Sequence, residues 1–279
     1  MLKLFRNNFK KTNDCIILAT PLIIFLSILS WYFSYAVNTV DNIPKLIFAV
    51  VTILIMASGC LSAWLYMAKK TIQVADRVFV FDKDRGKALI ELLISLPKGI
   101  GRLFLPMLSV ITIALLIYGG VTALVTFLIS KYIGTVDINL INSDNLLLSS
   151  QELINEINEL TTREIIVINC WYILIYLITT ILSFFGILWI PEIVYCEKNP
   201  FKALVFALKK LIITFPKTLF LFIYITVLSI IISIINTVLM FNPITYFIVL
   251  LLYYYFIVYI VVLLFRYYEQ TFLKNEKEN

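Results

Sequence analysis

The stretch LFLFIYITVLSIIISIINTVL, from Leu219 to Leu239, contains no Asp, Glu, Lys or Arg. A helix needs about 20 consecutive apolar residues to cross roughly 30 Å of hydrocarbon at about 1.5 Å per residue. Fifteen of its residues are Leu, Ile, Val or Phe. Each of these contributes up to about −0.5 kcal/mol to insertion, which outweighs the few polar residues. The stretch therefore predicts a membrane-spanning helix.

Five further stretches share this length and this lack of charge: Ile16–Val37, Leu46–Met67, Leu103–Ile129, Ile165–Ile190 and Tyr246–Phe265. The whole chain of 279 residues is 61% hydrophobic and 14% charged. Soluble domains are about 45–50% apolar and about 25% charged. The sequence predicts an all-α polytopic membrane protein, with residues 1–279 forming a single membrane domain of six transmembrane helices.

The basic residues predict the orientation of these spans. Twenty of the 23 Lys and Arg residues lie in the N-terminal segment, the connections 69–102 and 191–218, and the C-terminal tail. The positive-inside rule places such segments in the cytoplasm. Both termini are therefore predicted to be cytoplasmic, and the acidic loop 131–164 extracytoplasmic. Within that loop, the capping-box spacing of Ser149 and Glu152 predicts a short helix.

A cleaved signal peptide is an alternative interpretation of the N-terminus. A basic start precedes the first apolar run, and the sequence SYA occurs at Ser34–Ala36. However, the run Ile16–Val37 is longer than the 7–15 residues typical of a signal peptide, and a second span follows directly. These features favour a retained first span.

Two charged, half-apolar stretches share one pattern. They are FDKDRGKALIELLISLPKG, from Phe81 to Gly99, and CEKNPFKALVFALKKLIITFPK, from Cys196 to Lys217. Each reads acid, Lys, Asp or Asn, two residues, then Lys-Ala-Leu, and continues as a leucine-rich helical stripe up to Pro-Lys. Both are too short to span a membrane. They predict a repeated amphipathic helix that lies in the membrane interface, and the N-terminal LKLFRNNFKKT is a third, rudimentary one.

The boundaries of these interfacial elbow helices follow from their terminal residues. Asp84 and Asn199 are the predicted N-caps, and a proline cannot continue the helical hydrogen-bond ladder. Pro97 and Pro216 therefore predict the ends. The two elbows are expected at 84–97 and 199–216, on the cytoplasmic side.

The elbow pattern resembles the membrane domain of glycerophosphodiester phosphodiesterases and related uncharacterised bacterial six-helix proteins. The residues that carry the resemblance are Glu197, Lys198, Asn199, Pro200, Ala203 and Leu204, and in the first copy Asp82, Lys83, Ala88 and Leu89. The resemblance implies a six-helix bundle in the bacterial cytoplasmic (inner) membrane and nothing catalytic. No stretch of this chain is expected to form the soluble phosphodiesterase barrel of that family.

The basic residues of the elbows are candidates for contact with lipid headgroups, because a lysine near an anionic surface contributes about 1 kcal/mol to binding. These candidates are Lys87, Lys98, Arg102, Lys202, Lys209, Lys210 and Lys217. The alternative is that they only satisfy the positive-inside rule.

Polar residues within the spans suggest further contacts. Asn169 and Asn236 lie at similar predicted depth and could form an interhelical hydrogen bond, or each could bond its own helix. Tyr255 and Tyr259 share a face of the last span and could line a polar cavity, or pack with their hydroxyls bonded to neighbours. Glu192 follows Pro191 at a span end and could reach into the bundle, but we expect it to act as an interfacial cap.

Several kinds of chemistry are disfavoured. The chain has no histidine, and its cysteines, at 15, 60, 170 and 196, form no CxxC pair, so no metal or cofactor is expected. The lysines lie beside the spans, so no nucleic-acid partner is expected either. Two functions remain open: a non-enzymatic scaffold or lipid-associating bundle, whose partners are anionic membrane lipids or another membrane protein, and a transporter or lipid-handling protein with a cavity between the pseudo-repeats. An intramembrane enzyme is disfavoured, because few acid–base groups are available.

Overall fold

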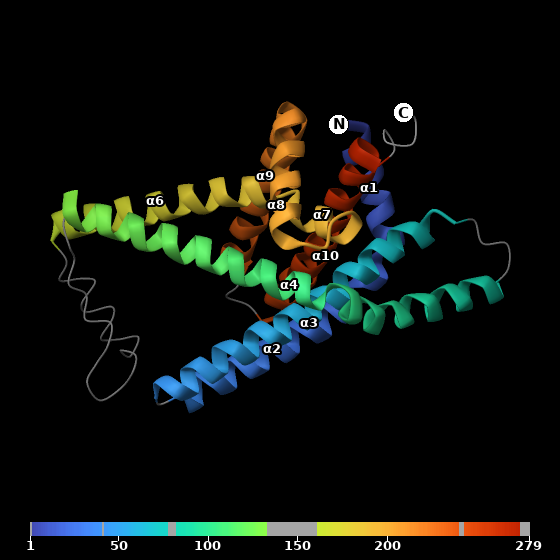
Figure 1. Cartoon of the computed structure of the whole chain (residues 1–279), viewed down its shortest axis with the longest axis horizontal. Coiled ribbons are helices and arrows are strands. Elements are labelled where there is room, and N and C mark those ends of the chain that lie inside the picture. The colour runs from blue at the N-terminus through green and yellow to red at the C-terminus, as the bar shows by residue number, and fades with distance from the viewer. Residues whose placement is uncertain (1, 41, 78–81, 133–160, 240–242, 274–279) are drawn as a thin grey trace. The chain divides into compact units, whose positions relative to one another are not determined.

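The computed structural model describes the chain except for residues 1, 41, 78–81, 133–160, 240–242 and 274–279 (Figure 1). The described residues form helices and short connections, with no strand among them, which confirms the all-α prediction. In chain order the elements are α1 (Leu2–Asp14), η1 (Ile16–Leu18), α2 (Ala19–Thr39), α3 (Ile43–Ala75), α4 (Asp82–Tyr132), α6 (Thr162–Gly186), α7 (Trp189–Tyr195), α8 (Pro200–Ile213), α9 (Phe215–Leu239), α10 (Pro243–Tyr268) and a π-helical turn, η2 (Glu269–Leu273).

Six helical segments are long and apolar enough to cross a membrane. They are Ile16–Thr39, Ile43–Ala75, Gly86–Lys131, Glu164–Tyr195, Phe215–Leu239 and Ile244–Leu273. Each contains one of the six predicted apolar runs, so the prediction of six spans is confirmed and the chain is an integral membrane protein. The predicted short helix that begins with the Ser149–Glu152 capping box falls outside the described residues.

The chain divides into two compact units. One consists of residues 1–112 and 184–279, and the other of residues 113–183. The second unit contains the C-terminal part of α4 and most of α6. The first unit contains every other element and all of the contacts described below, unless stated otherwise.

The buried side chains of the first unit occur in several helices, α2, α4 and α9 among them. Most lie in α1, in residues 58–74 of α3, in α7 and α8, and in residues 256–268 of α10. We call these segments the collar. Figure 1 shows α1 beside the C-terminal part of α10, and Phe5 of α1 stacks on Tyr224 of α9 with 4.0 Å between ring centroids. The opposite halves of α2, α3 and α10 expose large apolar side chains, as surfaces in contact with lipid do.

The second elbow forms as a separate helix, as the sequence predicts. The side chain of Asn199 accepts hydrogen bonds from the backbone N–H groups of Phe201 (3.1 Å) and Lys202 (3.2 Å), so the predicted N-cap is confirmed. Pro200 occupies the first helical position, where its missing N–H costs nothing. The predicted end at Pro216 is wrong, because α8 ends at Ile213 and Pro216 lies in the first turn of α9.

The first elbow does not form a separate helix, which corrects the prediction for 84–97. Residues 82–132 form one continuous helix, α4, with Pro97 and Pro106 inside it and Asp84 within its first turn rather than at its N-cap. A proline in a helix frees one carbonyl, but nearby Ser side chains and neighbouring helices can supply other contacts in a membrane. Pro97 leaves the Leu93 carbonyl without its helical partner, and one residue earlier Ser95 donates a hydrogen bond to the Leu92 carbonyl at 2.6 Å. The helix nevertheless passes through Pro97 instead of ending there.

Small residues on both elbows allow close packing against the collar. Ala88 and Ala203, which share a position in the repeated pattern, are both buried. Two residues beyond Pro97, the backbone of Gly99 lies so close to α3 that a Cβ atom there would be 2.7 Å from the Ser62 carbonyl oxygen. The two copies of the pattern thus place a small side chain against the protein at the same position.

Candidate functional site

A buried carboxylate lies in the collar, on the short helix α7. Glu192 is only 2% exposed, so its predicted role as an interfacial cap is wrong. The reason is that α7 packs against α3, α8 and α10 and carries Glu192 into their interface. A buried carboxylate is stable only when hydrogen bonds and an opposite charge compensate its lost hydration.

Lys210 and Tyr268 supply this compensation. The Lys210 ammonium of α8 lies 2.9 Å and 3.2 Å from the two carboxylate oxygens of Glu192 and donates to the Tyr268 hydroxyl at 2.6 Å. The Tyr268 hydroxyl in turn donates to Glu192. The Cys196 sulfur lies 3.3 Å from the same hydroxyl. We call Glu192, Cys196, Lys210 and Tyr268 the Glu192 cluster; it joins α7, α8 and α10.

A second lysine–tyrosine contact lies beside this cluster. The Lys69 ammonium of α3 donates to the Val194 carbonyl at 2.8 Å and lies 4.5 Å from the centre of the Tyr195 ring. The Tyr195 ring is stacked on that of Tyr268, with 5.6 Å between centroids. Lys210 likewise lies 4.9 Å from the centre of the Tyr268 ring. Two cation–π contacts therefore flank one pair of stacked tyrosines and connect α3 to the cluster.

A row of hydroxyl groups continues from the cluster along α8 and α9. Thr214 donates to the Lys210 carbonyl at 2.8 Å and shares a hydrogen bond of 3.0 Å with Thr218. Thr218 shares one of 2.8 Å with the Tyr267 hydroxyl of α10. These polar groups form hydrogen bonds with one another. Together with the Glu192 cluster, they connect four helices: α7, α8, α9 and α10.

Six of the seven predicted headgroup contacts have exposed side chains: Lys87, Lys98, Arg102, Lys202, Lys209 and Lys217. Arg102 also donates to the Tyr66 hydroxyl of α3 at 2.9 Å. The seventh, Lys210, faces Glu192 instead. Its position off the apolar stripe predicted an exposed cation, but α8 turns this side toward α7.

The outward face of α8 combines lysines with large apolar side chains. Ala203, Ala207 and Leu211 are buried against the collar, so the predicted apolar stripe faces protein. On the other side, Phe201, Val205 and Ile212 are 62–72% exposed. Lys202 and Lys209, seven residues apart and hence almost two full turns, lie together on that side. The helix is apolar on its protein face and amphipathic on its outer face.

The two asparagines of the predicted polar pair are both exposed. Asn169 belongs to the second unit and donates to the Ile165 carbonyl of its own helix at 2.8 Å. Asn236 belongs to the first unit. Their mutual hydrogen bond stays a prediction.

The predicted cavity-lining tyrosines pack against α1. Tyr255 donates to the Asn13 side chain at 2.8 Å, and Tyr259 shares a hydrogen bond of 2.8 Å with Tyr224. The ring of Phe9 lies 5.9 Å from that of Tyr255 and 6.3 Å from that of Tyr259. Both hydroxyls are thus bonded to neighbouring side chains on this face of α10.

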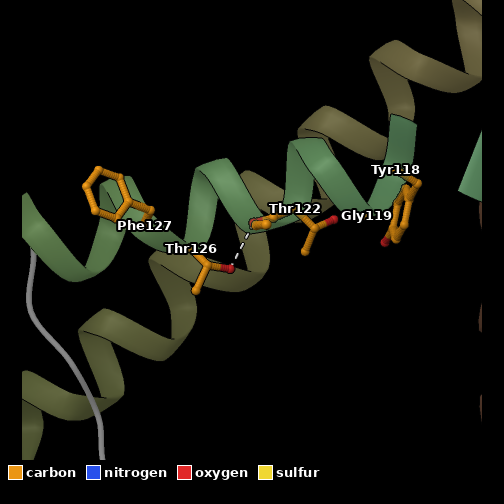
Figure 2. Close-up of a pocket in the computed structure, with 6 residues that line it drawn as sticks. Tyr118, Gly119, Thr122, Thr126 and Phe127 are labelled. Atoms are coloured by element: carbon orange, nitrogen blue, oxygen red, sulfur yellow. Dashed lines mark hydrogen bonds between the residues drawn. The ribbon is translucent and has the colours of Figure 1, made fainter. Parts of the chain in front are cut away.

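The second unit contains a hollow of about 620 Å³ beside α4, between Tyr118 and Phe127 (Figure 2). Its described lining comes from one helix. The Thr126 hydroxyl donates to the Thr122 carbonyl at 2.8 Å, so it is occupied within α4. The hollow therefore offers few polar groups to a ligand.

Sequence reasoning missed Tyr268 and Lys69 because neither belongs to a motif, and the contacts that join them to Glu192 and Tyr195 are long-range. No group of three or more His, Cys, Asp or Glu residues that could hold a metal ion occurs in the described part of the chain. Compared with protein-family models, curated proteins and solved structures, the sequence matches none.

Proposed function

We propose that this integral membrane protein is a non-enzymatic scaffold of the bacterial cytoplasmic membrane that associates with anionic lipids through its elbows. The observation that carries the proposal is the outer face of α8, where Lys202 and Lys209 lie among exposed Phe201, Val205 and Ile212. An interfacial helix places such apolar side chains among acyl chains and extends its lysines to the headgroups.

The first elbow offers the same combination. Lys87 and Lys98 are exposed on α4, as are the apolar side chains of Ile90 and Leu93. With about 1 kcal/mol for each lysine near an anionic surface, four lysines would retain a small group of anionic headgroups.

The Glu192 cluster supports a scaffold rather than a catalyst. Its carboxylate, ammonium and phenol groups are bound to one another, and their geometry fastens helices α7, α8 and α10 in place. A catalytic acid or base needs a substrate proton within hydrogen-bond reach. Here the groups that could act in this way already serve as partners of each other.

Neutralising the α8 lysines tests the lipid contact. Lys202→Gln together with Lys209→Gln removes two exposed charges without changing a buried residue. We expect native mass spectrometry to count fewer bound anionic lipids, with folding unchanged. The variant Lys202→Arg/Lys209→Arg keeps both charges and should bind as the natural chain does. An unchanged lipid number and headgroup preference in the Gln variant would refute the contact.

The proposed orientation has a separate test. Single cysteines at Ser143 and at Lys274, in a cysteine-free background, would be treated in intact cells with a membrane-impermeant thiol reagent. We expect labelling at 143 and protection at 274. The reverse pattern would invert the topology.

A further inference from the structure

A pocket of about 570 Å³ lies where α1, η1, α3 and α4 meet, all within the first unit. Its apolar lining includes Ile17, Val74, Leu89 and Leu92, and its polar lining includes Asp14 and Arg77. These residues lie at the start of the first span, the end of the second and the start of the third. The pocket is therefore expected at the boundary between hydrocarbon and headgroups. Its volume suits part of an amphipathic molecule.

Four charged residues near the pocket form two ion pairs, whereas the carboxylate of Asp14 does not form one. Lys11 is paired with Asp76 at 2.5 Å, and Arg77 is paired with both carboxylate oxygens of Glu91 at 2.8 Å and 3.2 Å. The side chain of Asp14 has no ion pair or hydrogen bond to any other described residue. Of the two charged residues that line the pocket, Arg77 is therefore paired, and Asp14 presents a carboxylate without a partner among the described residues.

This distribution favours a zwitterion over an anion. A primary ammonium group can donate to the exposed Asp14 carboxylate. The Arg77 guanidinium has five N–H donors, and its contacts with Glu91 leave others for a phosphate oxygen. Ile17, Leu89 and Leu92 supply apolar surface for the start of an acyl chain.

We propose that this pocket binds one zwitterionic phospholipid with a primary ammonium headgroup, phosphatidylethanolamine. The ammonium binds Asp14, the phosphate binds Arg77, and the glycerol end of an acyl chain lies against Leu89 and Leu92. None of the elbow lysines contributes to this site, and its ligand is a zwitterionic lipid. The site is therefore separate from the proposed contact between the elbow lysines and anionic lipids.

Lipid competition on the full-length chain tests the site. The protein in mild detergent would be incubated with equal amounts of phosphatidylethanolamine, phosphatidylcholine and phosphatidylglycerol, and the retained lipids counted by native mass spectrometry. We expect one retained phosphatidylethanolamine. Choline has no N–H to donate, and the glycerol headgroup has no cation for Asp14. Equal retention of the three lipids would overturn the proposal.

Two variants locate the binding. Asp14→Asn should weaken phosphatidylethanolamine retention roughly five- to tenfold through loss of a charge-assisted hydrogen bond. Its matched control, Glu197→Gln, makes the same change of charge at the turn before α8, where the side chain can still accept from the Asn199 N–H. Leu89→Trp, at a half-exposed position, should reduce retention by filling the pocket while Asp14 is unchanged. If Asp14→Asn and Glu197→Gln bind alike, the site is refuted.

Two further experiments distinguish a lipid from a free headgroup as the ligand, and the pocket from α8 as the site. Soluble glycerophosphoethanolamine should not displace the lipid at equal concentration, because it lacks acyl chains; full displacement would refute a lipid ligand. The variant Lys202→Gln/Lys209→Gln should retain phosphatidylethanolamine as the natural chain does. Loss of this lipid in that variant would place its binding at α8 and contradict the pocket.

Discussion

The Lys210 ammonium lies 2.9 Å from the Glu192 carboxylate, and this contact joins α8 to a carboxylate that is almost fully removed from solvent. Both groups also form hydrogen bonds with the hydroxyl of Tyr268 in α10, so three helices are joined by these contacts. A buried ion pair contributes little net stability over an apolar pair, but removal of one partner leaves an uncompensated charge. The contact therefore fixes how these helices meet.

Substitution of Glu192 and Lys210, singly and together, measures the energetic coupling between the two side chains. We expect Glu192→Gln or Lys210→Gln alone to lower the free energy of unfolding by about 3 kcal/mol. The double variant should cost less than the sum of the two, because no unpaired charge remains. Unfolding in a detergent titration measures all three. Strict additivity would show that the two groups are not coupled.

The close approach of α4 to α3 makes Gly99 sensitive to any side chain. In Gly99→Ala the new Cβ would lie 2.7 Å from the Ser62 carbonyl oxygen and 2.8 Å from the Tyr66 Cβ. We expect a loss of about 1–3 kcal/mol, as for other overpacked sites. The control is Gly101→Ala, where no described atom lies within 4 Å of the new Cβ. There the helix should be unaffected or gain up to about 1 kcal/mol. Equal effects at both positions would contradict the close contact.

The start of the second elbow depends on one side chain. Asn199→Ala removes the acceptor for the N–H groups of Phe201 and Lys202 and should lower stability by about 1 kcal/mol. Asn199→Asp retains an acceptor and should fold as the natural chain does. Thermal unfolding in detergent compares the three proteins. A loss in Asn199→Asp equal to that in Asn199→Ala would argue against capping.

Cys15, which follows α1, and Cys196, which follows α7, should differ in reactivity. Cys15 is fully buried, and burial raises the pKa of its thiol to about 12, whereas Cys196 is exposed. Maleimide at pH 8 should label Cys196 in the detergent-solubilised protein well before Cys15. Mass spectrometry of two variants, each with only one of these cysteines, measures the two labelling rates. Comparable rates would contradict the burial of Cys15.

The raised pKa of Cys15 also predicts a dependence on alkaline pH. Between about pH 9 and 12 the folded chain keeps a proton that the unfolded chain releases, so the free energy of unfolding falls as pH rises. Other groups titrate in this range, so the natural chain is compared with Cys15→Ala. The natural chain should lose more stability than the variant, and parallel curves would exclude the effect.

Patterns local in the sequence predicted much of the fold. Six apolar runs specified six spanning helices, and Asn199-Pro200 specified the start of α8, because cap and first-turn geometry depend on adjacent residues. The helix end predicted at Pro97 was wrong, because α4 continues through this residue despite the tendency of proline to end a helix. Propensity is a weak signal where neighbouring helices can compensate for a lost hydrogen bond.

The contacts of the collar and of the neighbouring α4 are non-local, and no spacing of residues along the chain predicts them. Gly99 meets Ser62, and Glu192 meets Tyr268, across long stretches of chain. The apolar stripe of α8 was identified, but periodicity alone could not show whether protein or lipid covers it. Ala203 and Leu211 are buried against protein, whereas Phe201 and Ile212 are exposed on the other side of the helix, so apolar residues occur on both sides.

The pairing of Glu192 with Lys210 also bears on the electric field across a membrane. That field acts on an elementary charge with about 2.3 kcal/mol per 100 mV over the full membrane thickness. The carboxylate and the ammonium lie 2.9 Å apart, so the field acts on them with nearly equal and opposite force. If α7 and α8 move together, this pair carries no net gating charge. The cluster can therefore keep two ionised groups at the membrane boundary without making the position of these helices depend on the membrane potential.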